Sequence, residues 1–134
     1  MTIELWMLVW AIVLTFVQML IAVQGATIQV GLTTLAGNRE EMPALSDWKG
    51  RADRSYRNMR EYLLLFAALV LVAHVANATS GLSALGAQIF LYARVVYAVV
   101  YLIGIPWLRT GVWAVSVVGM VLIAVSIFQA PSAA

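Results

Sequence analysis

The sequence predicts an all-α membrane protein, a single domain over residues 1–134 in which four transmembrane helices form a bundle. Composition is the first observation behind this prediction, because the chain is 63% hydrophobic and 10% charged, whereas soluble domains carry about 25% charged residues. The second is four apolar segments, each long enough to cross about 30 Å of hydrocarbon. The chain has no cysteine, so it has no disulfides, and any thiol chemistry must come from a substrate.

The four predicted spans follow one another along the chain. No Lys or Arg precedes the first span, which is also too long for the core of a signal peptide, so we interpret it as a retained helix. The helix of the second span is predicted to begin upstream of its apolar part, near Lys49. Pro106 precedes the fourth span and suits the start of a helix. The apolar segments cover residues 5–32, 62–78, 85–105 and 107–129.

Basic residues are concentrated in one connection. Six of the eight lie between Arg39 and Arg60, and Arg109 lies in the third connection. Because cytoplasmic loops carry the excess of Lys and Arg, we expect the first and third connections in the cytoplasm and both termini on the opposite side. A nucleic-acid-binding protein would need a broader basic surface, so membrane lipids rather than nucleic acid are the expected partners.

A strongly polar helical face stands at the start of the second span. At 100° per residue, five polar residues fall within an arc of about 100°: Arg51, Arg54, Asn58, Glu61 and Tyr62. Arg57 lies at the edge of this polar stripe, and Arg60 lies on the opposite face. Ionisable residues at membrane depth are costly and usually mark a site. The structural alternative is an ion-pair network between subunits.

The third span carries a second polar face. Arg94, Tyr97 and Tyr101 lie within about 60° of one another, and the predicted topology places them at the depth of the polar stripe, with Arg109 nearby. Guanidiniums bind carboxylates in bidentate fashion, and Glu61 could accept an ammonium. The residues therefore fit a small zwitterion with more than one carboxylate, while the alternative is that Arg94 pairs with Glu61 to join two helices. No cluster of His, Cys and carboxylates predicts a metal site.

Small and aromatic residues give weaker signals. Gly104, Gly111 and Gly119 are expected to permit close approach of helices. Tryptophans favour the membrane interface, and five are candidates for such anchors: Trp6, Trp10, Trp48, Trp107 and Trp113.

Two segments resemble the signatures of the MAPEG family, the membrane-associated proteins in eicosanoid and glutathione metabolism. The first is Arg54-x-x-x-Asn58-x-x-Glu61-Tyr62, followed by the apolar letters LLLF. The second is residues 93–111, ARVVYAVVYLIGIPWLRTG, with an Arg, two Tyr and a later Arg. The runs GNREEMP and LVLVAHVA are similar to bacterial members of the family.

The resemblance implies a homotrimer of four-helix subunits. For a bacterial inner membrane, the distribution of basic residues places both termini in the periplasm. Glutathione, as co-substrate, would bind between neighbouring subunits near the cytoplasmic side, and Arg109 would be the catalytic residue that stabilises its thiolate. The residues that would hold glutathione are Arg51, Arg54, Arg57, Asn58, Glu61, Tyr62, Arg94, Tyr97 and Tyr101. The implied function is glutathione transfer to lipophilic electrophiles, or reduction of hydroperoxides, as in detoxification.

Two other function classes remain open. One is a non-catalytic lipid- or glutathione-binding membrane protein on the same scaffold. The other is a small four-span multidrug transporter, which would need a carboxylate midway along the first helix. Glu4 stands at the start of that helix and no other acidic residue follows within it, so the transporter is the weakest of the three.

Overall fold

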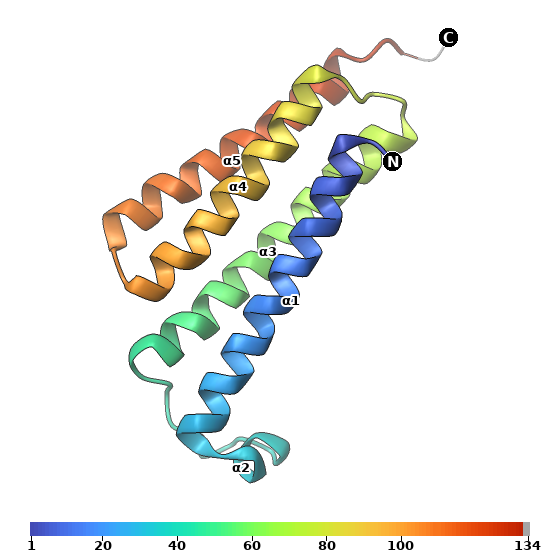
Figure 1. Ribbon diagram of the computed structural model, residues 1–134. Coiled ribbons are helices and arrows are strands. Elements are labelled where there is room, and N and C mark those ends of the chain that lie inside the picture. The colour runs from blue at the N-terminus through green and yellow to red at the C-terminus, as the bar shows by residue number, and fades with distance from the viewer. Residues whose placement is uncertain (133–134) are drawn as a thin grey trace.

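The computed structural model describes residues 1–132, and every regular element within them is an α-helix. Four long helices alternate in direction, so that both termini lie at one end of the bundle and the first and third connections lie at the other (Figure 1). Each is long and apolar enough to cross a membrane, which confirms the predicted fold class. The helices are α1 Ile3–Val30, α2 Leu32–Ala36, α3 Asp47–Val75, α4 Gly81–Ile103 and α5 Pro106–Gln129, of which α2 is one short turn.

The ends of α1 follow from local chemistry. At its start, the Thr2 hydroxyl accepts a hydrogen bond of 3.3 Å from the Leu5 backbone N–H, which satisfies one of the first free donors of the helix. At its end, Gly31 has a φ of +84°, a conformation open to glycine but not to a continuing helix. The predicted span of residues 5–32 therefore runs past the observed end of α1, and α2 begins after the break.

The first connection is tied back to α1 before α3 begins. The Gln29 amide donates to the Ala44 carbonyl over 3.1 Å and accepts from the Ser46 backbone N–H over 3.0 Å. Helix α3 begins at Asp47, two residues before the predicted start. It continues without interruption to Val75, so the polar stripe and the apolar second span belong to one helix.

Capping explains where α4 and α5 begin. Ser80 and Ser83 form a capping box, in which the Ser80 backbone N–H donates to the Ser83 hydroxyl over 2.8 Å, and α4 begins four residues before its predicted apolar segment. Gly104 ends α4 in the left-handed conformation, with a φ of +88°. Its role is thus the termination of a helix, not the predicted close approach of two helices. Pro106 is the first residue of α5, as predicted.

The helices associate as two antiparallel pairs, α1 with α3 and α4 with α5 (Figure 1). The pairs join through a hydrophobic core in the half of the bundle that holds the termini, where the Phe66 and Phe90 rings stack with centroids 4.0 Å apart. Gly86 and Gly119 bring the α4 and α5 backbones together, because a Cβ on either would lie within 2.6 Å of the other's carbonyl oxygen. Gly119 therefore behaves as predicted, whereas a Cβ on Gly111 would meet no atom within 4 Å.

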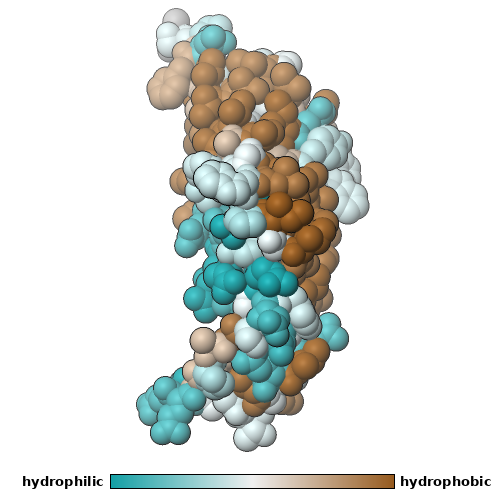
Figure 2. Space-filling view, turned by 90° about the vertical axis from the view of Figure 1, so that its left-hand side faces the viewer, coloured by the Kyte–Doolittle hydropathy of each residue, from teal (hydrophilic) through white to brown (hydrophobic). Residues whose placement is uncertain are grey.

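Most of the charged residues lie in the other half of the bundle. Figure 2 shows hydrophilic residues gathered over the lower part of one face, below a largely hydrophobic upper part. Large apolar side chains are exposed along the outside of the long helices, among them Phe16, Val99 and Trp107, the last 88% exposed. An apolar exterior of this kind is the lipid-contacting surface of an integral membrane protein.

Candidate functional site

Arg94 is the centre of the polar half of the bundle. It lies in the middle of α4 and is only 1% exposed. Its Nη2 donates a hydrogen bond of 2.7 Å to the side-chain oxygen of Asn58 on α3. The predicted meeting of the two polar faces is thus realised by direct contact, across helices that are antiparallel neighbours in the bundle.

Aromatic rings surround the Arg94 guanidinium. Its Cζ lies 4.2 Å from the ring centroid of Tyr97 and 5.3 Å from that of Tyr62. The face of an aromatic ring attracts a cation, and the attraction strengthens when water is excluded. Tyr62 in turn meets the Trp113 ring of α5 edge to face, with centroids 6.2 Å apart. Residues of α3 and α4 therefore contact the guanidinium, and α5 supports it indirectly through Tyr62.

The Arg94 guanidinium has no carboxylate partner within residues 1–132. Its Nε and Nη1 are buried and make no hydrogen bond in this part of the chain, and the single ion pair found there joins Arg57 to Asp53. Glu61 is exposed and does not pair with Arg94, so the alternative of an Arg94–Glu61 pair is wrong for the single chain. Two donors of a buried cation thus remain open to an anionic ligand.

A second arginine lies nearer the α4–α5 connection, at the start of α5. The Arg109 guanidinium of α5 lies with its Cζ 4.7 Å from the ring centroid of Tyr101. The Tyr101 ring also meets the Tyr97 ring edge to face at 5.6 Å, so the two tyrosines connect the two arginines. We call this set the Arg94 cluster, and its members are Asn58, Tyr62, Arg94, Tyr97, Tyr101 and Arg109.

Arg51 lies at the same end of the bundle but contacts the backbone of α4. Its Nε donates a hydrogen bond of 3.0 Å to the backbone carbonyl of Leu102, in the last turn of α4. The last carbonyls of a helix lack partners within the helix and favour a nearby cation. Arg51 therefore joins the start of α3 to the end of α4, beside the cluster.

The remaining predicted residues face outward. Arg54, Arg57 and Glu61 are all exposed on α3, and Arg57 pairs over 3.0 Å with Asp53 one turn before it. Their side chains make no hydrogen bond or ion pair with the cluster within residues 1–132. In the single chain, the polar stripe thus divides into an inner part that contacts α4 and an outer part that is open.

The sequence profile of the MAPEG family matches residues 3–129. This chain belongs to the MAPEG family. The match covers all four long helices and both polar faces. Comparison with curated protein sequences and with solved structures gave no significant match. The family contains glutathione transferases, glutathione peroxidases and other members, and its members generally use glutathione.

The site of this MAPEG protein includes residues that sequence reasoning missed. Trp113 was expected to anchor the chain at the membrane interface, yet it is half-buried against Tyr62. Asp53 was not singled out, although it neutralises Arg57 at the spacing of i and i+4 that predicts such a pair. The contact between Arg51 and the Leu102 carbonyl was also missed, because a backbone acceptor leaves no mark in the pattern of side chains.

Proposed function

We propose that this MAPEG protein binds glutathione at the Arg94 cluster and transfers its thiolate to lipophilic electrophiles. One observation carries the proposal: a guanidinium only 1% exposed, at membrane depth, bonds to a neutral amide and keeps two unpartnered donors. A buried charge without a counterion is costly. A ligand carboxylate would offset much of that cost by a charge-assisted hydrogen bond to one of these donors.

The charge of the surroundings supports an anionic ligand with more than one carboxylate. Five arginines belong to the cluster or to the polar stripe and its edge, and the nearby carboxylates are Asp53, next to Arg57, and Glu61. One of the two, Asp53, already pairs with Arg57. Glutathione carries two carboxylates and one ammonium, so the arginines match its carboxylates and the exposed Glu61 matches its ammonium. Arg51 would contribute from beside the cluster, and Arg54 and Arg57 from the outer part of the polar stripe.

Arg109 is the proposed catalytic residue. A thiol with a pKa near 8.5 is mostly protonated at neutral pH, and a neighbouring guanidinium lowers that pKa and raises the thiolate fraction. The thiolate then attacks the electrophilic atom of the second substrate, so that a carbon–sulfur bond forms while the leaving group departs with its electron pair. With a hydroperoxide, two glutathione molecules are oxidised to the disulfide while the O–O bond is reduced to an alcohol and water.

Assembly would complete the site. We include in the proposal a homotrimer in which a neighbouring subunit covers the outer part of the polar stripe, because Arg54 and Glu61 face outward from the single chain. The site would lie at the cytoplasmic side of a bacterial inner membrane, and lipophilic substrates would enter from the bilayer.

Binding and turnover separate this proposal from its alternatives. Purified protein would be titrated with S-methylglutathione by calorimetry, since that analogue keeps both carboxylates but has no thiol. Turnover would be measured with glutathione and chlorodinitrobenzene. Saturable binding together with turnover is expected. Binding without turnover of this electrophile or of a lipid hydroperoxide would favour the non-catalytic glutathione-binding protein, and no binding at millimolar concentration would refute both.

A further inference from the structure

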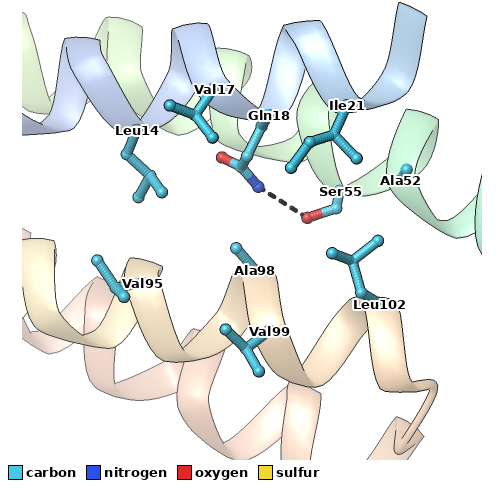
Figure 3. A pocket seen from close by; sticks show the side chains of 10 residues that line it. All are labelled: Leu14, Val17, Gln18, Ile21, Ala52, Ser55, Val95, Ala98, Val99 and Leu102. Carbon is cyan, nitrogen blue, oxygen red and sulfur yellow. Dashed lines mark hydrogen bonds between the residues drawn. The ribbon is translucent and has the colours of Figure 1, made fainter. Parts of the chain in front are cut away.

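A cavity of about 170 Å³, partly open to the outside of the bundle, lies between α1, α3 and α4. Figure 3 shows its lining side chains projecting from the two facing helices α1 and α4, with α3 behind. None of the cluster residues lines it. Its walls are aliphatic apart from two side chains, Gln18 and Ser55.

Gln18 extends from α1 into this cavity, and the oxygen of its side-chain amide accepts no hydrogen bond within residues 1–132. The side chain is 7% exposed, and its Nε2 donates a hydrogen bond of 2.9 Å to the Ser55 hydroxyl (Figure 3). Its Oε1 is buried. An unpaired buried acceptor costs roughly 1–3 kcal/mol, so this oxygen is a preformed place for a donor.

Ser55 supplies the complementary half of the contact. It is 2% exposed, and in its bond with Gln18 its oxygen is the acceptor. Its hydroxyl proton thus remains available for a second partner. One acceptor and one donor therefore stand side by side in an otherwise apolar space, an arrangement that matches the two hydrogen-bonding capacities of a single hydroxyl group.

We propose that this cavity binds a compact apolar molecule that carries one hydroxyl, such as a small phenol dissolved in the bilayer. The hydroxyl donates to the Gln18 oxygen and accepts from Ser55, while the ring lies against the aliphatic walls. The size is suitable, because an apolar cavity of about 150 Å³ accommodates benzene, and the open side of this one would admit a molecule from the bilayer. Water suits the space less well, since a buried water usually needs about three polar partners and two are present.

The test uses two probes of nearly equal shape, para-fluorophenol and para-fluorotoluene. Each would be titrated by fluorine NMR against the full chain in lipid nanodiscs, with empty nanodiscs subtracted. The phenol is expected to bind saturably and about tenfold more tightly than the toluene, as befits one hydrogen bond to a buried acceptor. Equal affinities would overturn the role of Gln18, and no saturable binding of either probe would overturn the site.

Substitutions inside and outside the cavity test whether the probes bind there. Gln18→Leu removes the acceptor and should bring the two affinities within about twofold. Ala98→Leu fills the cavity from α4 and should abolish saturable binding of both probes, whereas Ala114→Leu, on the exposed side of α5, should leave it unchanged. If Ala98→Leu does not fold, the affinities of the two probes for the unaltered protein still test whether the cavity binds a hydroxyl-bearing molecule. Displacement of the phenol by saturating glutathione would contradict a cavity separate from the Arg94 cluster.

Discussion

The Arg94 guanidinium donates a hydrogen bond of 2.7 Å to Asn58, a neutral partner, in the interior of the bundle. An amide orients the guanidinium without neutralising it. A carboxylate in the same place would satisfy Arg94 as an ion pair and leave it little attraction for a ligand. Asn at position 58 thus leaves the positive charge of Arg94 free to attract a ligand. The buried, unneutralised charge destabilises the unliganded protein.

Asn58→Asp should therefore weaken glutathione binding while preserving or raising stability. The new carboxylate is close in shape to the amide and pairs with Arg94, where it competes with the carboxylates of the ligand. We expect the Kd for S-methylglutathione to rise at least about tenfold, the effect of losing one charge-assisted interaction. Calorimetry gives the Kd, and thermal unfolding followed by circular dichroism gives the stability.

Asn77→Asp is the matched control for that variant. Asn77 lies in the turn between α3 and α4, at the end of the bundle that holds the termini. The same substitution adds the same charge there, far from Arg94, and should leave the Kd within about twofold. If both variants weaken binding equally, the net charge of the protein rather than the Arg94–Asn58 contact controls affinity.

Arg109→Ala should raise the pKa of the bound glutathione thiol. Loss of the guanidinium removes the positive charge that favours the thiolate, so the thiol stays protonated to higher pH. Turnover at neutral pH should fall and partly recover at alkaline pH, and the Kd should change little. The ultraviolet absorbance of the thiolate, followed against pH in the complex, measures the shift directly. An unchanged thiol pKa would mean that Arg109 does not activate glutathione.

Arg60→Ala serves as the control for Arg109→Ala. Arg60 is exposed and stacks on Tyr56 at 5.2 Å, away from the cluster. Its removal should change neither the thiol pKa nor turnover. Glu61→Ala should behave differently from both, because loss of a partner for the ligand ammonium weakens binding without moving the thiol pKa.

The contact between Arg94 and Asn58 was predictable because helical periodicity is regular. Fixed steps of 100° per residue place Asn58 on the polar stripe and Arg94 on the second polar face, and alternating spans bring equal depths together. The helix ends were less predictable. Apolar segments indicate only the part of a helix that lies in the hydrocarbon. The first residues of α1 and α4 are determined by the N-caps Thr2 and Ser80, which accept hydrogen bonds from backbone N–H groups.

The inner and outer parts of the polar stripe could not be separated from the sequence. Tyr62 and Glu61 both belong to the polar stripe and lie at its two edges, 100° apart, yet Tyr62 contacts Arg94 and Glu61 is exposed. That difference depends on which flank of α3 is covered by α4 and α5, and periodicity does not fix this choice. The Gln18–Ser55 hydrogen bond was missed for a similar reason. The sequence shows a polar side chain in an apolar helix, but it does not show which residue that side chain contacts.

Arg51→Lys and Arg51→Met should separate two roles of one side chain. Both lose the hydrogen bond from the Arg51 Nε to the Leu102 carbonyl, so both should lose about 1–2 kcal/mol of stability. Lys keeps the positive charge beside the cluster, whereas Met does not. We expect glutathione affinity to fall only in Arg51→Met, measured by calorimetry. Equal affinities in the two variants would restrict Arg51 to holding the end of α4.

Gly86→Ala should loosen the α4–α5 pair. The new methyl group would lie 2.5 Å from the Gly119 carbonyl oxygen, which belongs to the backbone and cannot rotate away. Overpacking of this kind costs about 1–3 kcal/mol. Gly111→Ala is the control, because its methyl group meets no atom within 4 Å and alanine favours a helix by up to about 1 kcal/mol. Thermal unfolding should show Gly86→Ala destabilised and Gly111→Ala unchanged or stabilised. Equal stability of the two variants would mean that α4 and α5 are not in close backbone contact.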